Sequence, residues 1–169
     1  MTSLFETDRL IFRDWSSADL ESFHAICSDP AVMQFVLDGE PWSLERTRQW
    51  IENAIETSKT AGYCRWALFS KETAELIGFC GFVPAHDSAE IGWRLSQPHW
   101  GQGLASEAAQ TALKYGFDNL KFQRVTALVQ SLNRPSIRVC EKLGMNFESS
   151  FLRNGREVLV YAIRHDQKP

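Results

Sequence analysis

Apolar and polar residues alternate in several short segments of the chain, and a period of two is typical of half-buried β-strands. Two glycines inside the third segment, Gly78 and Gly81, indicate a bulge or the close approach of another segment. Asn154-Gly155, between the last two segments, predicts a tight hairpin. The predicted strands are residues 7–13, 64–69, 76–83, 89–95, 124–129, 145–152 and 156–163.

Four other segments carry apolar residues on one face at a spacing near 3.6 residues, as amphipathic helices do. The first has Ser16-Ser17 as an N-cap, includes residues 20–27 and is interrupted by Asp29-Pro30. The last ends at Gly144, a residue type that is common just after a helix. After this first helix, the predicted helices are residues 43–58, 104–117 and 133–143.

The predicted elements follow the order β-α-α-β-β-β-α-β-α-β-β. This order favours an α/β fold with one mixed β-sheet and helices on both of its faces. We find no internal repeat, no low-complexity segment and no linker in the 169 residues. The length is typical of one domain, so we expect a single domain over residues 1–169.

Composition and charge exclude several classes of partner. The formal net charge is −3 and no run of Lys or Arg exceeds two residues, so we expect no nucleic-acid partner. No apolar run approaches the ~20 residues of a membrane span, and the first six residues lack the layout of a signal peptide. The four cysteines and four histidines are scattered, which favours reduced, buried thiols, a cytoplasmic location and no bound metal.

A glycine-rich turn stands between the predicted strand 89–95 and the predicted helix 104–117. Its residues are Trp100-Gly101-Gln102-Gly103-Leu104. Glycines allow backbone angles that other residues avoid, and the first N–H groups of a helix are unpaired. Together these features form an anion site, usually for phosphate. Alone, Gly-x-Gly is a weak signal, and an ordinary strand-to-helix turn is the simpler interpretation.

Three segments together resemble the GNAT superfamily of N-acetyltransferases, in particular its RimJ/RimL-like branch, the ribosomal-protein N-terminal acetyltransferase type. Residues 7–13, TDRLIFR, are similar to that branch's opening T-x-R-L-x-L-R strand. Residues 90–95, EIGWRL, and 98–108, PHWGQGLASEA, resemble the strand and loop that hold acetyl-CoA. Residues 133–145, NRPSIRVCEKLGM, resemble the N-x-x-S-x-x-x-x-E-K-x-G-F stretch. The resemblance implies the GNAT fold, whose central sheet is splayed.

The resemblance also implies a binding site for acetyl-CoA and no metal. Backbone N–H groups of residues 101–106 would hold the pyrophosphate, and the strand 90–95 would splay from its neighbour to pair with the pantetheine arm. Asn133 is either a helix N-cap or a pantetheine contact, or both. The implied cofactor-binding residues are Trp93, Arg94, Leu95, Trp100, Gly101, Gln102, Gly103, Leu104, Ala105, Ser106, Asn133 and Ser136.

Two departures from the family pattern affect the chemistry. Trp100 stands where many members begin the loop with Gln or Arg, although the RimJ/RimL-like branch often has an aromatic residue there. Cys140 stands where many members carry a tyrosine as general acid. Our hypothesis is that Ser136 donates to the departing thiolate while Cys140 packs in the core, with Cys140 as the alternative acid. Glu90 is either a general base, direct or through water, or a solvated strand-end carboxylate.

The expected reaction is transfer of acetyl from acetyl-CoA to a primary amine in a ternary complex. A protein or peptide N-terminal amine is the first expectation, and a polyamine, amino acid or aminoglycoside is the alternative. A CoA-binding sensor without catalysis is the alternative from another class. The resemblance places Phe35, Trp42 and Trp50 where the first helices of the RimJ/RimL-like branch form the wall of the acceptor site, and Phe35 and Trp42 are the expected acceptor-binding residues. The chain is expected to be a monomer or a homodimer.

Overall fold

The computed structural model describes residues 4–86 and 88–167. Within them, the strands and helices alternate broadly as predicted, and the ends of the predicted elements shift by a few residues. The strands are β1 (Phe5–Glu6), β2 (Leu10–Arg13), β3 (Arg65–Ser70), β4 (Leu76–Ala85), β5 (Ser88–Leu95), β6 (Arg124–Gln130), β7 (Asn146–Arg153) and β8 (Arg156–Arg164). The α-helices are α1 (Leu20–Cys27), α2 (Pro30–Met33), α3 (Leu44–Ala61), α4 (Leu104–Asp118) and α5 (Arg134–Lys142).

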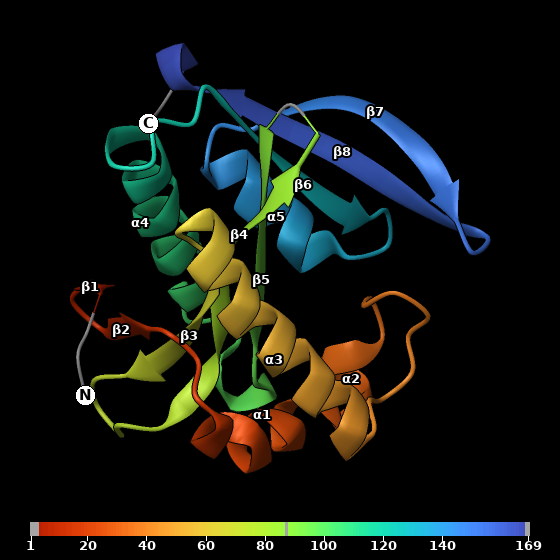
Figure 1. The fold of residues 1–169 in the computed structure, drawn as a ribbon. Coiled ribbons are helices and arrows are strands. Elements are labelled where there is room, and N and C mark those ends of the chain that lie inside the picture. The colour runs from red at the N-terminus through yellow and green to blue at the C-terminus, as the bar shows by residue number, and fades with distance from the viewer. Residues whose placement is uncertain (1–3, 87, 168–169) are drawn as a thin grey trace.

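The strands form one open mixed sheet in the order β1-β2-β3-β4-β5-β6-β8-β7 (Figure 1). All neighbouring strands are antiparallel except β5 and β6, which are parallel. A parallel pair needs a crossover connection, and α4 provides it. The α/β architecture with one mixed sheet is confirmed.

Helices cover both faces of this sheet, as predicted. Phe79 on β4 contacts aromatic rings of Phe23 in α1 and Trp50 in α3. Phe82, three residues further along the same strand, points to the opposite face and lies where a Cβ on Gly116 of α4 would touch it. One continuous cluster of buried apolar residues includes side chains from both faces.

One local prediction was wrong and another was incomplete. Residues 7–13 do not form one strand, because the hydroxyl of Thr7 accepts hydrogen bonds from the backbone N–H groups of Arg9 and Leu10 and closes a turn between β1 and β2. Asp29-Pro30 not only interrupts the first helix but also begins a second, α2. There, the Asp29 carboxylate accepts from the backbone N–H of Ala31, and proline suits the first helical position.

The glycines inside β4 are required by close approach. A Cβ on Gly78 would lie 1.9 Å from the carbonyl oxygen of Arg94, and one on Gly81 would lie 2.3 Å from that of Cys64. The pairing of β3 with β4 also shifts register between Leu68 and Phe69. Both parts of the sequence prediction, a bulge and a close approach, are therefore confirmed.

Candidate active site

The sheet opens between its two parallel strands. β5 and β6 pair only at Ala89 with Val125 and at Glu90 with Thr126. Beyond these positions β5 continues to Leu95 and β6 to Gln130 without further pairing to each other. The splay implied by the family resemblance is present, and it leaves the later backbone groups of β5 available to another partner on that side.

Two cavities adjoin this gap. The first has a volume of ≈ 260 Å³ and lies between β5, β6, α3 and the loop after α2. The second has a volume of ≈ 450 Å³ and lies between the glycine loop, α5 and the end of β5. The residues that line both are Phe35, Val36, Trp93, Arg94, Asn133 and Ser136. The two cavities therefore meet at the residues where β5 passes the start of α5.

The glycine loop lines the second cavity and has the form of an anion site. Gly101 and Gly103 have φ of 73° and 79°, in the left-handed region that favours glycine. Within the described residues, the backbone N–H groups of residues 101–106 donate no hydrogen bond to the protein. A Cβ on Gly103 would meet only Arg9, 3.8 Å away. Open space beside unpaired N–H donors at a helix N-terminus suits a phosphate group.

Side chains of the loop fix its conformation. The indole N–H of Trp100 donates to the carbonyl oxygen of Leu95 at 2.7 Å, which ties the loop to the end of β5. The side-chain amide of Gln102 donates to the carbonyl of Pro98 at 2.8 Å. The indole N–H of Trp100 and the side-chain amide N–H of Gln102 are therefore both bonded to the protein itself.

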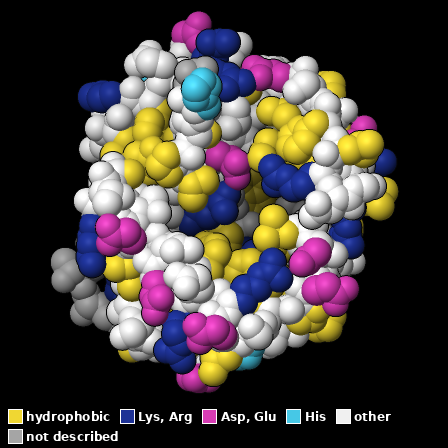
Figure 2. All heavy atoms as spheres, turned by 45° about the vertical axis from the view of Figure 1, so that its right-hand side comes forward, with side chains coloured by type: hydrophobic (Ala, Val, Ile, Leu, Met, Phe, Trp, Pro, Cys, Tyr) yellow, Lys and Arg dark blue, Asp and Glu magenta, His cyan; other side chains and the backbone are white. Residues whose placement is uncertain are grey.

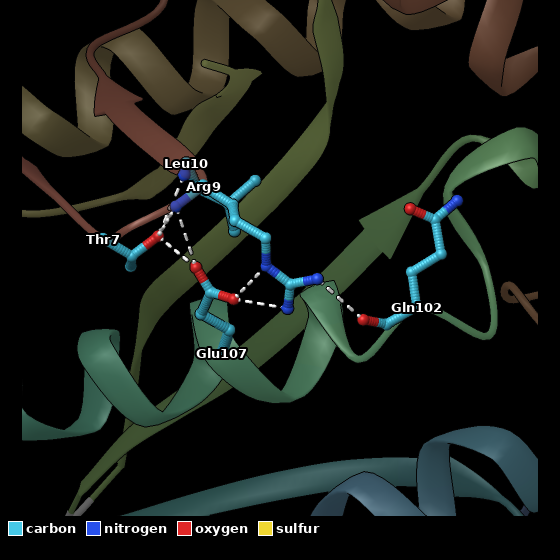
Figure 3. Close-up of polar contacts among 5 residues, drawn as sticks. All are labelled: Thr7, Arg9, Leu10, Gln102 and Glu107. Atoms are coloured by element: carbon cyan, nitrogen blue, oxygen red, sulfur yellow. Dashed lines mark hydrogen bonds and ion pairs between the residues drawn. The ribbon is translucent and has the colours of Figure 1, made fainter. Parts of the chain in front are cut away.

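A polar cluster from the first turn of the chain supports the same loop (Figure 3). Arg9 donates to Glu107 of α4 at 2.7 Å and to the carbonyl oxygen of Gln102 at 3.0 Å. Thr7 also donates to Glu107. Partial burial acts to raise the pKa of Glu107, but the hydrogen bonds from Thr7 and Arg9 outweigh it and hold the pKa below its usual value. Glu107 therefore has the structural role that its place in the first helical turn suggests.

Glu90 lies at the floor of the first cavity with a cationic partner. The guanidinium of Arg65 donates to its carboxylate at 2.6 Å. Arg65 reaches Glu90 by crossing Gly92, where a Cβ would lie 2.8 Å from the Arg65 Nε atom. Burial lowers the pKa of the Arg65 guanidinium, and the charge of Glu90 opposes this shift. Glu90 is therefore an ion-paired carboxylate and not a freely solvated one.

Arg94 shares that face of β5, because alternate residues of a strand point the same way. Its guanidinium lies 4.5 Å from the ring centre of Trp42 and 5.2 Å from that of Phe79. It also donates to the Sγ atom of Cys27 at 3.1 Å. The side chain of Arg94, predicted only as part of the acetyl-CoA strand, thus extends toward α1 and the first cavity.

The start of α5 brings Asn133 and Ser136 to the junction of the cavities. The Asn133 side chain accepts from the backbone N–H of Ser136 at 3.2 Å, so its role as N-cap is confirmed. Within the described part of the chain, the Ser136 hydroxyl has no hydrogen-bond partner. Cys140 is fully buried, and burial raises the pKa of its thiol to about 12. Neither cavity is lined by Cys140.

The outer wall of the first cavity comes from residues distant in sequence. Phe35, Trp42 and Trp50 line it together, and Phe35 also lines the second cavity. Arg156 donates to the carbonyls of Gln34 and Asp38 at 2.9 and 2.8 Å, which holds this loop against the β7–β8 hairpin. Figure 2 shows a hollow in this side of the molecule, bordered by hydrophobic, basic and acidic side chains.

Comparison with known proteins identifies the family. Residues 9–146 match the acetyltransferase (GNAT) domain. The chain belongs to the GNAT family. As a member, it is an acyltransferase that transfers acetyl to an amine.

Individual relatives agree with this assignment. The chain is 34% identical over 163 residues to the uncharacterised N-acetyltransferase p20 of Bacillus licheniformis, covering 92% of this chain and 91% of that protein. It is similar to a GNAT acetyltransferase structure from Bacillus anthracis, with 30% identity, a TM-score of 0.85 and coverage of 95% and 98% of the two chains. A complex of the ribosomal L7/L12 acetyltransferase RimL with coenzyme A shares the fold, at 20% identity and a TM-score of 0.84 over 99% and 100% of the chains.

The structure also bears on metal binding, membrane spans and the state of the cysteines. The described residues include no group of three or more His, Cys, Asp or Glu side chains placed to hold a metal ion. No helix among them is long and apolar enough to cross a membrane. The four cysteines are free and buried, as their scatter in the sequence predicted.

Three arginines near the candidate site were not predicted from the sequence, namely Arg9, Arg65 and Arg156. Arg65 meets Glu90 across 25 positions of sequence and Arg9 meets Glu107 across 98, and no local pattern indicates such pairs. The only sequence signal for Arg65 is indirect. Gly92 stands in the middle of β5, and a glycine inside a strand is often a sign of close approach; here the Arg65 side chain lies against it.

We expect Gly103→Val to weaken acetyl-CoA binding by about tenfold or more, because the branched side chain would occupy the space beside the loop N–H groups and displace charge-assisted hydrogen bonds. Calorimetry measures this affinity. Gly144→Val is the matched control, since Gly144 has a similar φ of 72°, open space around it and no place in either cavity. Unchanged affinity in Gly103→Val would show that the loop does not bind the pyrophosphate.

We expect Arg9→Met to weaken acetyl-CoA binding about three- to tenfold, the effect of losing one or two hydrogen bonds that hold the loop in place. Acceptor KM should change little, since Arg9 lines neither cavity. Arg48→Met, which removes a similarly exposed arginine from an ion pair on α3, serves as the control. Equal dissociation constants for both variants and wild type would contradict a positioning role for Arg9.

Proposed function

We propose that this protein transfers acetyl from acetyl-CoA to a primary α-amine by direct attack in a ternary complex. The observation that carries this proposal is the meeting of two cavities at Trp93, Arg94, Asn133 and Ser136, where β5 leaves β6. In this arrangement the thioester enters through the second cavity and the amine through the first. The two reactants meet at the opening of the sheet, which supplies the proximity that acyl transfer requires.

The donor half of the site fits acetyl-CoA. The unpaired N–H groups of residues 101–106 suit its pyrophosphate. Beyond Glu90, the edge of β5 has backbone groups free to pair with the amides of pantetheine, as an added strand would. The proposed contacts are Trp93, Arg94, Leu95, Trp100, Gly101, Gln102, Gly103, Leu104, Ala105, Ser106, Asn133 and Ser136.

The acceptor half favours an α-amine over a polycation. Three arginines, Arg65, Arg94 and Arg153, and one carboxylate, Glu90, line the first cavity, and this excess of positive charge opposes a polyamine or an aminoglycoside. Freeing a lysine-like amine at pH 7 costs roughly 4–5 kcal/mol, whereas an α-amine with a pKa near 7.7–8.0 costs only about 1 kcal/mol. Both arguments favour a peptide N-terminus, and the charge argument also admits an amino acid.

Glu90 and Ser136 have the proposed chemical roles. Glu90 accepts the proton of the attacking amine, directly or through water, as the new C–N bond forms. Ser136 donates a hydrogen bond to the departing thiolate as the C–S bond breaks. Cys140 is unsuited to this task because its side chain is fully buried and lines neither cavity. Phe35 and Trp42 would shape the acceptor pocket.

Release of free thiol from acetyl-CoA tests the proposal directly, with a panel of N-terminal peptides, amino acids and polyamines as acceptors. We expect turnover with α-amines, and Glu90→Gln should lower kcat modestly, because a water relay can partly replace the carboxylate. Arg65→Met should also lower kcat, since it removes the partner that orients Glu90. Tight binding of acetyl-CoA with no thiol release for any amine would instead indicate a CoA-binding sensor.

The choice of general acid is decided by two variants. We expect Ser136→Ala to lower kcat by about 10²-fold or less, because it removes the hydrogen bond that stabilises the departing thiolate. Cys140→Ala should leave kcat nearly intact and lower the unfolding midpoint instead, since this side chain is fully buried. Steady-state kinetics and urea unfolding on both variants provide the comparison. A large loss of kcat in Cys140→Ala with little change in Ser136→Ala would reverse the assignment.

A further inference from the structure

Three residues that line the first cavity each carry a buried side-chain donor that has no hydrogen-bond partner among the described residues. Among the described residues, four buried side-chain nitrogen or oxygen atoms have no hydrogen-bond partner. Three of them belong to residues that line this one cavity: Trp42 Nε1, Arg65 Nε and Arg94 Nε. All three are N–H donors. Buried polar groups are nearly always hydrogen-bonded in native proteins, so a cluster of donors indicates a missing acceptor.

Arg94 is the most exceptional member of this set. Its side chain is about nine-tenths buried, with 9% of the residue surface exposed. No ion pair among the described residues includes it, whereas Arg65 is paired with Glu90. Within the described residues, its side chain donates one hydrogen bond, to the neutral thiol of Cys27. The rings of Trp42 and Phe79 stabilise the cation in part, but they accept none of its planar N–H donors.

The surroundings of Arg94 also carry positive charge. Arg65 and Arg46 both act on it electrostatically, and burial lowers its pKa. The guanidinium nevertheless keeps its charge, because arginine is not deprotonated in proteins. A buried, unpaired cation is strongly unfavourable unless an anion completes the site. The planar fork of arginine matches the two oxygens of a carboxylate, which accepts hydrogen bonds and donates none when ionised.

We infer that the first cavity recognises a carboxylate carried by the amine acceptor itself, with Arg94 as the residue that determines this specificity. The inference rests on the proposed function and narrows its acceptor class. Trp42 and Arg65 supply further donors around the same anion. Glu90, held by Arg65, remains available for the amine proton.

The position of Arg94 sets how far apart the two groups of the acceptor lie. The segment of β5 that carries Arg94 lines both cavities, and the Arg94 side chain extends toward the first. A carboxylate bound by its guanidinium then lies in the same cavity as the amine that attacks the thioester. Free amino acids have this arrangement, and so do peptides with an acidic residue at the N-terminus. A polyamine or a neutral amine leaves the donors of Arg94, Arg65 and Trp42 unpaired.

Matched pairs of acceptors test the inference. One pair is an amino acid and its carboxamide, and another is a peptide with glutamate or glutamine at its first position. The wild-type protein should prefer the carboxylate member of a pair in kcat/KM by about 10- to 100-fold, the effect of a hydrogen-bonded charged group. A preference within the first pair would indicate that the acceptor is a free amino acid. A preference within the second pair would indicate a peptide with an acidic first residue.

Arg94→Met should reduce this preference to within about threefold, mainly by raising the KM of the carboxylate, and Arg94→Lys should restore part of it. Arg46→Met is the matched control. Arg46 also lies over Trp42, at 5.1 Å, but it is paired with Asp38 and lines neither cavity. We expect Arg46→Met to keep the wild-type preference. A merely structural role for Arg94 would change the unfolding midpoint and leave the ratio within each pair intact.

Binding of reaction products gives a readout that does not need turnover. Calorimetry in the presence of CoA should show N-acetyl amino acids binding tighter than their amides to the wild type, and equally to Arg94→Met. Equal binding and equal use of both members by the wild type would overturn the inference, and so would a preference that survives in Arg94→Met. Turnover of neutral α-amines with no such preference would leave the proposed function standing without the carboxylate site.

Discussion

The early end of the pairing between β5 and β6 is the constraint on which the site depends. The two strands share only two paired positions, so the hydrogen-bond ladder stops in the middle of the sheet. Elsewhere the ladder continues along most of each strand pair, from β2 to β8. Both helices that begin next to the opening, α4 and α5, have their N-termini at the second cavity. A single interruption thus provides open backbone groups, helix N-termini and a passage between two cavities.

Local chemistry explains why most of the fold could be predicted from the sequence. The alternation of apolar and polar residues predicted the strands. Gly144 and Gly155 stand at a helix end and a hairpin turn, where left-handed backbone is needed. The failures were also local. The Thr7 hydroxyl bonds to the backbone and turns a segment whose alternation favoured one strand, and Asp29 caps a four-residue helix too short for a periodic pattern.

Only some residues of the candidate site could be predicted from the sequence. Residues whose role depends on the backbone, such as Gly103 and Asn133, could be predicted because a glycine turn and an N-cap have their own sequence patterns. The arginines could not, since a long side chain reaches partners that sequence spacing does not specify. Arg65 crosses a neighbouring strand to Glu90, and Arg94 extends into an aromatic cluster formed by α1 and the segment before α3.

The contacts of Arg156 have a consequence for how such a site can diversify. Arg156 and Gln130 hold the loop at residues 34–39 through its backbone carbonyls, so the bonds persist whatever side chains the loop carries. The side chains of Phe35, Val36 and Leu37 are then free to vary on a fixed frame. Residues 88–106, which include most of the proposed donor contacts, take no part in these bonds. A change of side chain in the loop would therefore reshape the cavities that it lines without releasing the loop from the β7–β8 hairpin.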